Sequence, residues 1–189
     1  MTATWRKVFG AGLVAMGLAV AIGPMRAEIP LRQLEVRVTD HKPGIADFKR
    51  LTVSLSRVAI HPKGAPRTSG WIVLVENTAP VDIVPLKDGR WEKLGSKMIP
   101  TGRYDAIRIQ FAETEGLLHG GKRPTLLTRD TTVAANIDLS APGPQSIVID
   151  LFAENQTDHA PLRYAVKVKE VRPGAAPAGQ TTARGSVSQ

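Results

Sequence analysis

The side chains best suited to holding an ion flank the first predicted loop. Asp40 begins the turn-forming stretch DHKPG, residues 40–44, and Asp47 follows that stretch. Two carboxylates with loop carbonyls are the oxygen ligands that calcium prefers. The pair lacks the DxDxDG spacing of a dedicated calcium loop, however, and Asp side chains also cap turns. Both interpretations stay open, and turn capping is preferred.

Histidine, the commonest metal-ligating side chain, occurs four times in the chain. No two histidines are two or four residues apart, so no local pair is preset for a metal. Each lies at a predicted turn or strand end, where a solvent-exposed loop histidine is expected. The four are His41, His61, His119 and His159.

The stretch GLLHGGK at residues 116–122 matches the spacing of a phosphate-binding loop. Such a loop needs Ser or Thr after the lysine and a helix beyond it. Arg123 and Pro124 follow Lys122 instead, which predicts a glycine-rich hairpin or loop. No GxSxG, SxxK or HExxH motif occurs, and a chain without cysteine has no Cys–His pair. The sequence therefore predicts a non-enzymatic protein without a cofactor.

Two features are suited to recognition instead of catalysis. Trp71 and Trp91 could form a sugar platform, but Trp71 stands in the apolar run WIVLV and is expected in the core, with Trp91 accessible. The last predicted strand presents a basic set, which could meet an acidic polymer or lipid head groups or could discourage edge pairing. Its members are Arg163, Lys167, Lys169 and Arg172. With nine aromatic residues in 189, nucleic acid is not an expected partner.

The first 27 residues have the layout of a secretory signal. Arg6 and Lys7 precede an uncharged run, residues 8–23, and Pro24 and Ala27 supply the breaker and the cut site. Removing residues 1–27 deletes three positive charges and lowers the net charge from +8 to 22 − 17 = +5. A periplasmic or secreted protein is predicted. The alternative is an uncleaved anchor, although 16 apolar residues are short of the roughly 20 that span a bilayer.

The elements that must position these residues are strands, because apolar side chains alternate with polar ones from residue 34 onward. The pattern predicts an all-β fold: a single antiparallel β-sandwich of about seven to nine short strands over residues 30–172. A phase switch predicts a bulge near Ser56 and Arg57. Tyr104 is expected at a corner with its hydroxyl bonded to backbone. Residues 173–189 have no apolar period and are expected to be a disordered tail.

Several motifs resemble a known bacterial family, the domain of unknown function 4382. They are LEVRVTD (34–40), FKRLTVSLSRVAIHPKG (48–64), Gly70-Trp71, the run VDIVPLKDGRWEKLGSKMIPTGRYDAIRIQF (81–111) and, more loosely, IDLSAPGPQSIVIDLF (137–152). The resemblance implies an exported protein with an immunoglobulin-like or transthyretin-like sandwich and no assigned activity. The chain departs from the family's usual TDAP after Thr39, and it lacks a cysteine for lipidation.

These features predict an exported binding protein that contacts a protein or glycan partner through its loops, with the membrane involved only if the signal is retained. The loops are residues 40–47, 62–70 and 113–124. A structural module of an envelope complex and a calcium- or carbohydrate-binding module are the alternatives. The candidate binding residues are Asp40, His41, Asp47, His61, Arg67, Trp91, His119, Lys122 and Arg123.

Overall fold

The computed structural model describes residues 29–41, 45–142, 145–157 and 161–174, and in these ranges the chain is all-β. The predicted signal segment, and the tail beyond residue 174, lie outside the described residues. No helix in the described part of the chain is long and apolar enough to cross a membrane. The elements are β1 (Leu31–Asp40), β2 (Phe48–Pro62), β3 (Ile72–Glu76), β4 (Val81–Asp82), the 3-10 turn η1 (Val84–Leu86), β5 (Glu92–Pro100), β6 (Arg103–Leu118), β7 (Thr125–Thr128), β8 (Thr131–Asp138), β9 (Gln145–Asn155) and β10 (Arg163–Gly174).

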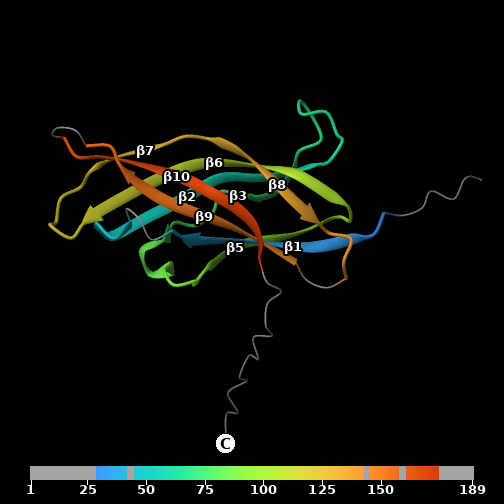
Figure 1. Ribbon diagram of the computed structural model, residues 1–189, viewed down its shortest axis with the longest axis horizontal. Helices are drawn as coiled ribbons and strands as arrows, with labels where there is room; N and C mark the ends of the chain where they lie inside the picture. The colour runs from blue at the N-terminus through green and yellow to red at the C-terminus, as the bar shows by residue number, and fades with distance from the viewer. Residues whose placement is uncertain (1–28, 42–44, 143–144, 158–160, 175–189) are drawn as a thin grey trace, which may run out of the picture.

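The strands form two five-stranded sheets (Figure 1). The first sheet has the order β5-β1-β9-β10-β7, and the second has the order β3-β2-β6-β8 with β4 paired to β2. Two expectations about these strands were wrong. The pairs β1/β9 and β7/β10 are parallel, an arrangement that the long connections between these strands permit and a hairpin would not. The strands are also not all short, since β2 has 15 residues and β6 has 16.

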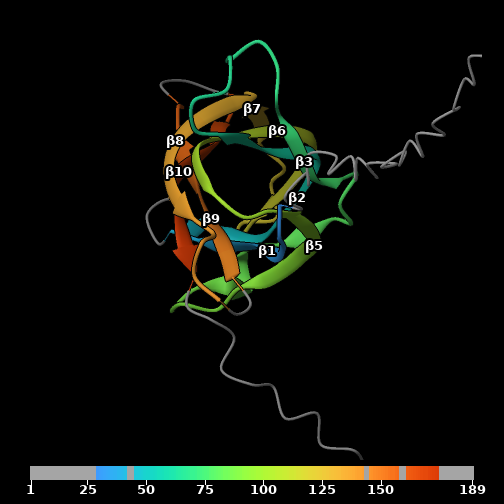
Figure 2. The same ribbon diagram turned by 90° about the vertical axis from the view of Figure 1, so that its right-hand side faces the viewer.

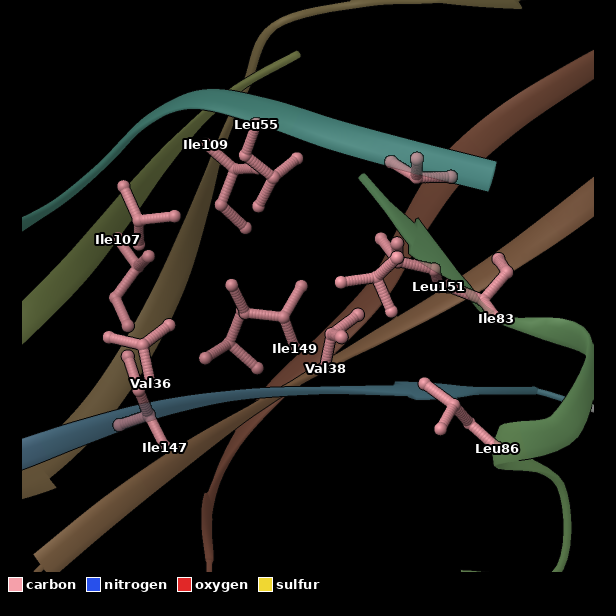
Figure 3. Packing of buried hydrophobic residues seen from close by; sticks show 14 of the residues in the cluster. Val36, Val38, Leu55, Ile83, Leu86, Ile107, Ile109, Ile147, Ile149 and Leu151 are labelled. Carbon is pink, nitrogen blue, oxygen red and sulfur yellow. The ribbon is translucent and has the colours of Figure 1, made fainter. Parts of the chain in front are cut away.

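One hydrophobic core lies between the sheets, and Figure 3 shows part of it. The alternation that predicted the strands places Val36 and Val38 of β1 and Ile149 of β9 on the inner face, where each is at most 2% exposed. From the second sheet, Leu55 and Ile109 meet them. Residues from strands far apart in sequence therefore share one buried layer, and this layer sets the sheets face to face.

Two local predictions on the second sheet are confirmed. The register of β2 against β6 shifts between Leu55 and Arg57, which is the predicted bulge. The Tyr104 hydroxyl donates a hydrogen bond to the carbonyl of Pro100 at 2.6 Å, and the ring is 3% exposed. Both features arise from local geometry, because a bulge changes the phase of one strand and a corner tyrosine reaches back only four residues.

Three other expectations are corrected. Trp71 is not a core residue: it is partly exposed, and β3 begins at the next residue and forms an edge of its sheet. The apolar residues between positions 81 and 86 predict one short strand there, but β4 ends at Asp82 because the chain turns into η1 around Pro85. The last strand extends to Gly174, two residues past the predicted domain boundary.

One segment switches between the sheets. β7 pairs with β10 in the first sheet, and after Arg129 and Asp130 the same run of chain continues as β8, paired with β6 in the second sheet. A strand that changes sheets in this way makes a corner between them. β8 and β10 therefore lie beside one another at one edge of the molecule without pairing in the described residues (Figure 2).

Candidate functional site

An open cleft lies at the end of the sheets where β1 finishes and β2 begins. We call it the end cleft; its volume is about 460 Å³, within the usual range for ligand-binding pockets. It is lined by Asp40, Ile45, Ala46, Phe48, Lys49, Val84, Lys87, Asp88 and His119. The buried side chains Ile45 and Phe48 provide an apolar base, and the lysines at 49 and 87 are exposed at its rim. The cleft therefore combines apolar contact with charges of both signs.

Main-chain and side-chain bonds hold the loops around this cleft. The backbone N–H of His119 donates to the carbonyl of Asp47 at 3.1 Å, which joins the loop after β6 to the loop before β2. The Tyr164 hydroxyl donates to the Asp47 carboxylate at 2.8 Å, which ties the same loop to β10. The structure thus brings three predicted residues, Asp40, Asp47 and His119, to one end of the molecule.

Beside the cleft lies a carboxylate pair, formed by the partly buried Asp40 of β1 and the buried Asp150 of β9. Burial raises the pKa of Asp40, and the nearby charges of Asp150 and Asp88 raise it further. Burial also raises the pKa of Asp150, against the lowering effects of His41 and Lys169. Asp150 is 6% exposed, and one oxygen of each of Asp40 and Asp150 is buried without a hydrogen-bond partner. The charge of Asp150 thus disfavours ionisation of Asp40, and the pair has unused hydrogen-bond acceptors beside the cleft.

His41 stands on the outer side of this pair. Its Nδ1 lies 3.5 Å from Asp150 Oδ2 and 2.9 Å from the Lys169 ammonium, so a basic residue of the last strand meets the loop after β1. Sequence reasoning missed Asp150 because it stands on a clean strand pattern, IVIDLF, where a polar residue reads as solvent-facing.

The geometry does not favour calcium between Asp40 and Asp47. The Asp47 carboxylate accepts a hydrogen bond from the Tyr164 hydroxyl. Asp40 instead lies close to Asp150, whose charge raises its pKa. Among the described residues no group of three or more His, Asp or Glu side chains is placed to hold a metal ion. The Asp47 carboxylate instead ties its loop to Tyr164 of β10.

The opposite end carries a second polar cluster, built on a histidine that was wrongly expected to be exposed. His61 is fully buried at the end of β2. Its Nδ1 lies 3.1 Å from Asp105 Oδ1, and its Nε2 lies 3.1 Å from the carbonyl of Pro66. Arg67 bonds the other oxygen of Asp105 at 3.1 Å. The loop at residues 62–71 thus folds back over the strand end, and His61 and Arg67 fasten it there.

The tryptophans do not form a shared sugar platform. The guanidinium of Arg108 lies 4.1 Å from the centre of the Trp71 ring, and that of Arg37 lies 3.7 Å from the centre of the Trp91 ring. Each indole therefore has one face covered by an arginine, a favourable cation–π arrangement. Trp91 is 37% exposed, as expected, and Arg37 beneath it is 3% exposed.

The glycine-rich stretch is a turn, as predicted, but a shorter one than the expected loop. Residues 113–118 belong to β6, and only residues 119–124 connect it to β7. The N–H of Gly121 bonds the carbonyl of Leu118 at 2.9 Å, and the strand that follows replaces the helix that a phosphate loop requires. Lys122 and Arg123 are exposed in this turn, near the end cleft.

The fold and these sites define a class of protein: an all-β domain of two facing sheets, with an open polar cleft formed by loops at one end. The family model described as domain of unknown function (DUF4382) matches residues 33–167, more than half of the chain. The chain belongs to this family, which confirms the resemblance carried by its sequence motifs. No curated protein and no solved structure matches the chain.

Proposed function

We propose that this protein is an exported, non-enzymatic binding module whose facing sheets form an immunoglobulin-like β-sandwich and whose loops receive a partner at the end cleft. The observation that carries the proposal is the convergence of three separate chain segments on one open cleft with an apolar base and a charged rim. Loops held by paired strands present side chains in a fixed arrangement, which is how many sandwich domains bind their partners.

The composition of the cleft supports a polar partner. Lys49 and Lys87 are exposed at its rim, and the partly buried Asp40, which pairs with Asp150, also lines the cleft. A protein segment or a glycan offers both hydrogen-bond donors for the carboxylates and apolar surface for Phe48. The envelope location rests on the predicted signal at residues 1–27.

Site-specific photo-crosslinking in the native cell tests the binding role. A photoreactive amino acid replaces Lys49 at the cleft rim, and a matched control replaces Lys63, an exposed lysine at the opposite end. We expect one discrete adduct from position 49, its absence from position 63, and its loss when Asp40→Lys is added. Equal crosslinking from both positions, or none from position 49, would refute binding at the end cleft.

The exported location has a separate test. N-terminal sequencing of the protein from the periplasmic or extracellular fraction is expected to begin at Glu28. Recovery from the cytosol with residue 1 intact would contradict export.

A further inference from the structure

A second surface, distinct from the end cleft, arises where the chain changes sheets. We call it the β8–β10 wedge: a cleft of about 550 Å³ between the diverging strands, lined by residues of the β7–β8 corner and by residues 165–168 of β10. The β7–β8 corner contributes Leu127, Thr128 and Arg129, and β10 contributes Val166, Lys167 and Val168. The wedge is open, and Leu127 is 45% exposed within it.

The wedge forms where the hydrogen-bonded ladder between β7 and β10 ends, before β10 itself ends. β7 pairs with β10 as far as Thr128 opposite Val166, and then the chain leaves to pair with β6. From Lys167 to Gly174, β10 bonds β9 on one side and has no ladder partner on the other side within the described residues. Backbone N–H and C=O groups on an open strand edge are a ready template for another strand.

The open stretch of edge is short. The register of β10 against β9 shifts between Val168 and Glu170, and Pro173, which has no N–H, follows. A bulge and a proline both interrupt pairing along an edge. Regular pairing is therefore confined to residues 167–169, a stretch shorter than the four residues of β7, in which Val168 turns its backbone groups away from β9. This suits a brief added strand and disfavours extended edge-to-edge assembly.

The side chains of the wedge indicate the chemistry of that strand. Leu127 and Val168 offer apolar contacts for alternate side chains of an extended segment. Arg129 and Lys167 are the charged residues of the lining, and no acidic residue lines it. Lys167 already meets Glu154, whereas the Arg129 side chain has no partner among the described residues. The uncompensated charge of the wedge is therefore positive.

We infer that the β8–β10 wedge binds an extended, acidic segment of a partner protein, which adds a short strand to β10 where β7 leaves it. Main-chain bonds along β10 supply affinity, and the apolar contacts and Arg129 supply selectivity, as in other cases of strand addition. The inference is independent of binding at the end cleft, because the two surfaces share no lining residue. It gives a physical basis to the role of an assembly module in an envelope complex.

A peptide titration on the full chain tests the inference. The probe is a synthetic eight-residue peptide alternating valine with glutamate, and two control peptides have lysine in place of glutamate or N-methylated alternate amides. Binding is measured by fluorescence anisotropy, and its location by hydrogen exchange of the backbone amides. We expect saturable binding of the acidic peptide, slowed exchange at Val168, whose backbone N–H faces away from β9, and no binding of either control peptide.

Charge reversal at the wedge provides the matched variants. We expect Arg129→Glu to weaken binding of the acidic peptide roughly tenfold or more, because it replaces an attraction by a repulsion. Arg90→Glu, which changes an exposed arginine outside both the wedge and the end cleft, leaves affinity unchanged. Both positions are exposed, so an unchanged melting temperature verifies folding. Absence of saturable binding, equal effects of the two variants, or self-association of the chain through β10 in place of peptide binding would overturn the inference.

Discussion

Tyr164 joins the loop around Asp47 to the first sheet, and replacing it with phenylalanine tests how the end cleft is held. The ring is 3% exposed and packs edge-on against Phe48, with ring centres 4.8 Å apart. The hydroxyl donates to Asp47 Oδ2 at 2.8 Å and accepts a hydrogen bond from Asn155 at 3.3 Å. Tyr164→Phe keeps the ring and removes these bonds. At pH 8 we expect it to lower the free energy of unfolding by about 1–2 kcal/mol.

The same contacts make the effect depend on pH. Burial, then the hydrogen bond and charge of Asp47, raise the pKa of Tyr164 from 10.0 to about 12. The unfolded chain releases the phenolic proton near pH 10, whereas the folded chain keeps it to about pH 12. Stability is therefore fully present below pH 10 and falls as pH rises from 10 to 12, by about 2–3 kcal/mol in total. Phenylalanine does not titrate, so the difference in free energy of unfolding between the wild type and the variant disappears as pH rises through this range.

Two measurements check this reasoning. Urea unfolding of both proteins at pH 8 and at intervals to pH 12 gives the difference in stability, and lysine titrations common to both cancel. The chain has two tyrosines, so absorbance titration of Tyr104→Phe reports Tyr164 alone. Asp47→Asn should move that titration toward lower pH. Ionisation of Tyr164 near pH 10, or a stability difference that stays constant from pH 8 to 12, would refute the assignment.

Three further predictions concern packing and charge. Gly95→Ala should cost about 1–3 kcal/mol in urea unfolding, because a β-carbon there would lie 2.5 Å from Val75 Cγ1 where β5 meets β3; wild-type stability would show that the sheet edges are not in contact. Asp150→Asn should raise the melting temperature at pH 7 and leave it unchanged at pH 3. The reason is that burial raises the pKa of Asp150 above 3.8 and destabilises only the ionised form of the carboxyl. Equal effects of the substitution at both pH values would contradict this. His61→Ala should lower the free energy of unfolding by about 2–4 kcal/mol and speed proteolysis of residues 62–70, whereas exposed Lys63→Ala should change neither.

The strands and their inner faces could be predicted because alternation is local. Val36 and Val38 are inward for the same reason that Arg37 between them is outward: successive side chains point to opposite faces of a strand. The exposure of a side chain was harder to predict. His61 follows a strand pattern into a Pro- and Gly-rich loop and looks solvent-exposed, but the loop folds back and covers it. The prediction for Trp71 was wrong in the opposite sense. It was expected in the core but is partly exposed, because its apolar run leads into an edge strand and not a central one.

The end cleft could be predicted only in part. Asp40, Asp47 and His119 were singled out as loop residues, but no feature of the sequence placed the two loops together. The bond from His119 to Asp47 joins residues 72 positions apart, and the carboxylate pair joins Asp40 to a residue on β9. Such contacts form only once the two sheets have packed together. Before that, each loop can adopt many conformations of similar energy, so the sequence of the loop does not predict its neighbours.

What the sequence by itself determined is therefore the class of fold, the faces of the strands, the bulge in β2, the Tyr104 corner and the family to which the chain belongs. Only the tertiary structure decided that β1 and β9 run parallel, that β10 lies inside its sheet for four residues and at an open edge thereafter, and that separate loops form the end cleft. The physical reason is that side-chain alternation is carried by each strand alone. The choice of neighbours is made by the shared core between the sheets, to which every strand contributes and which no single segment encodes.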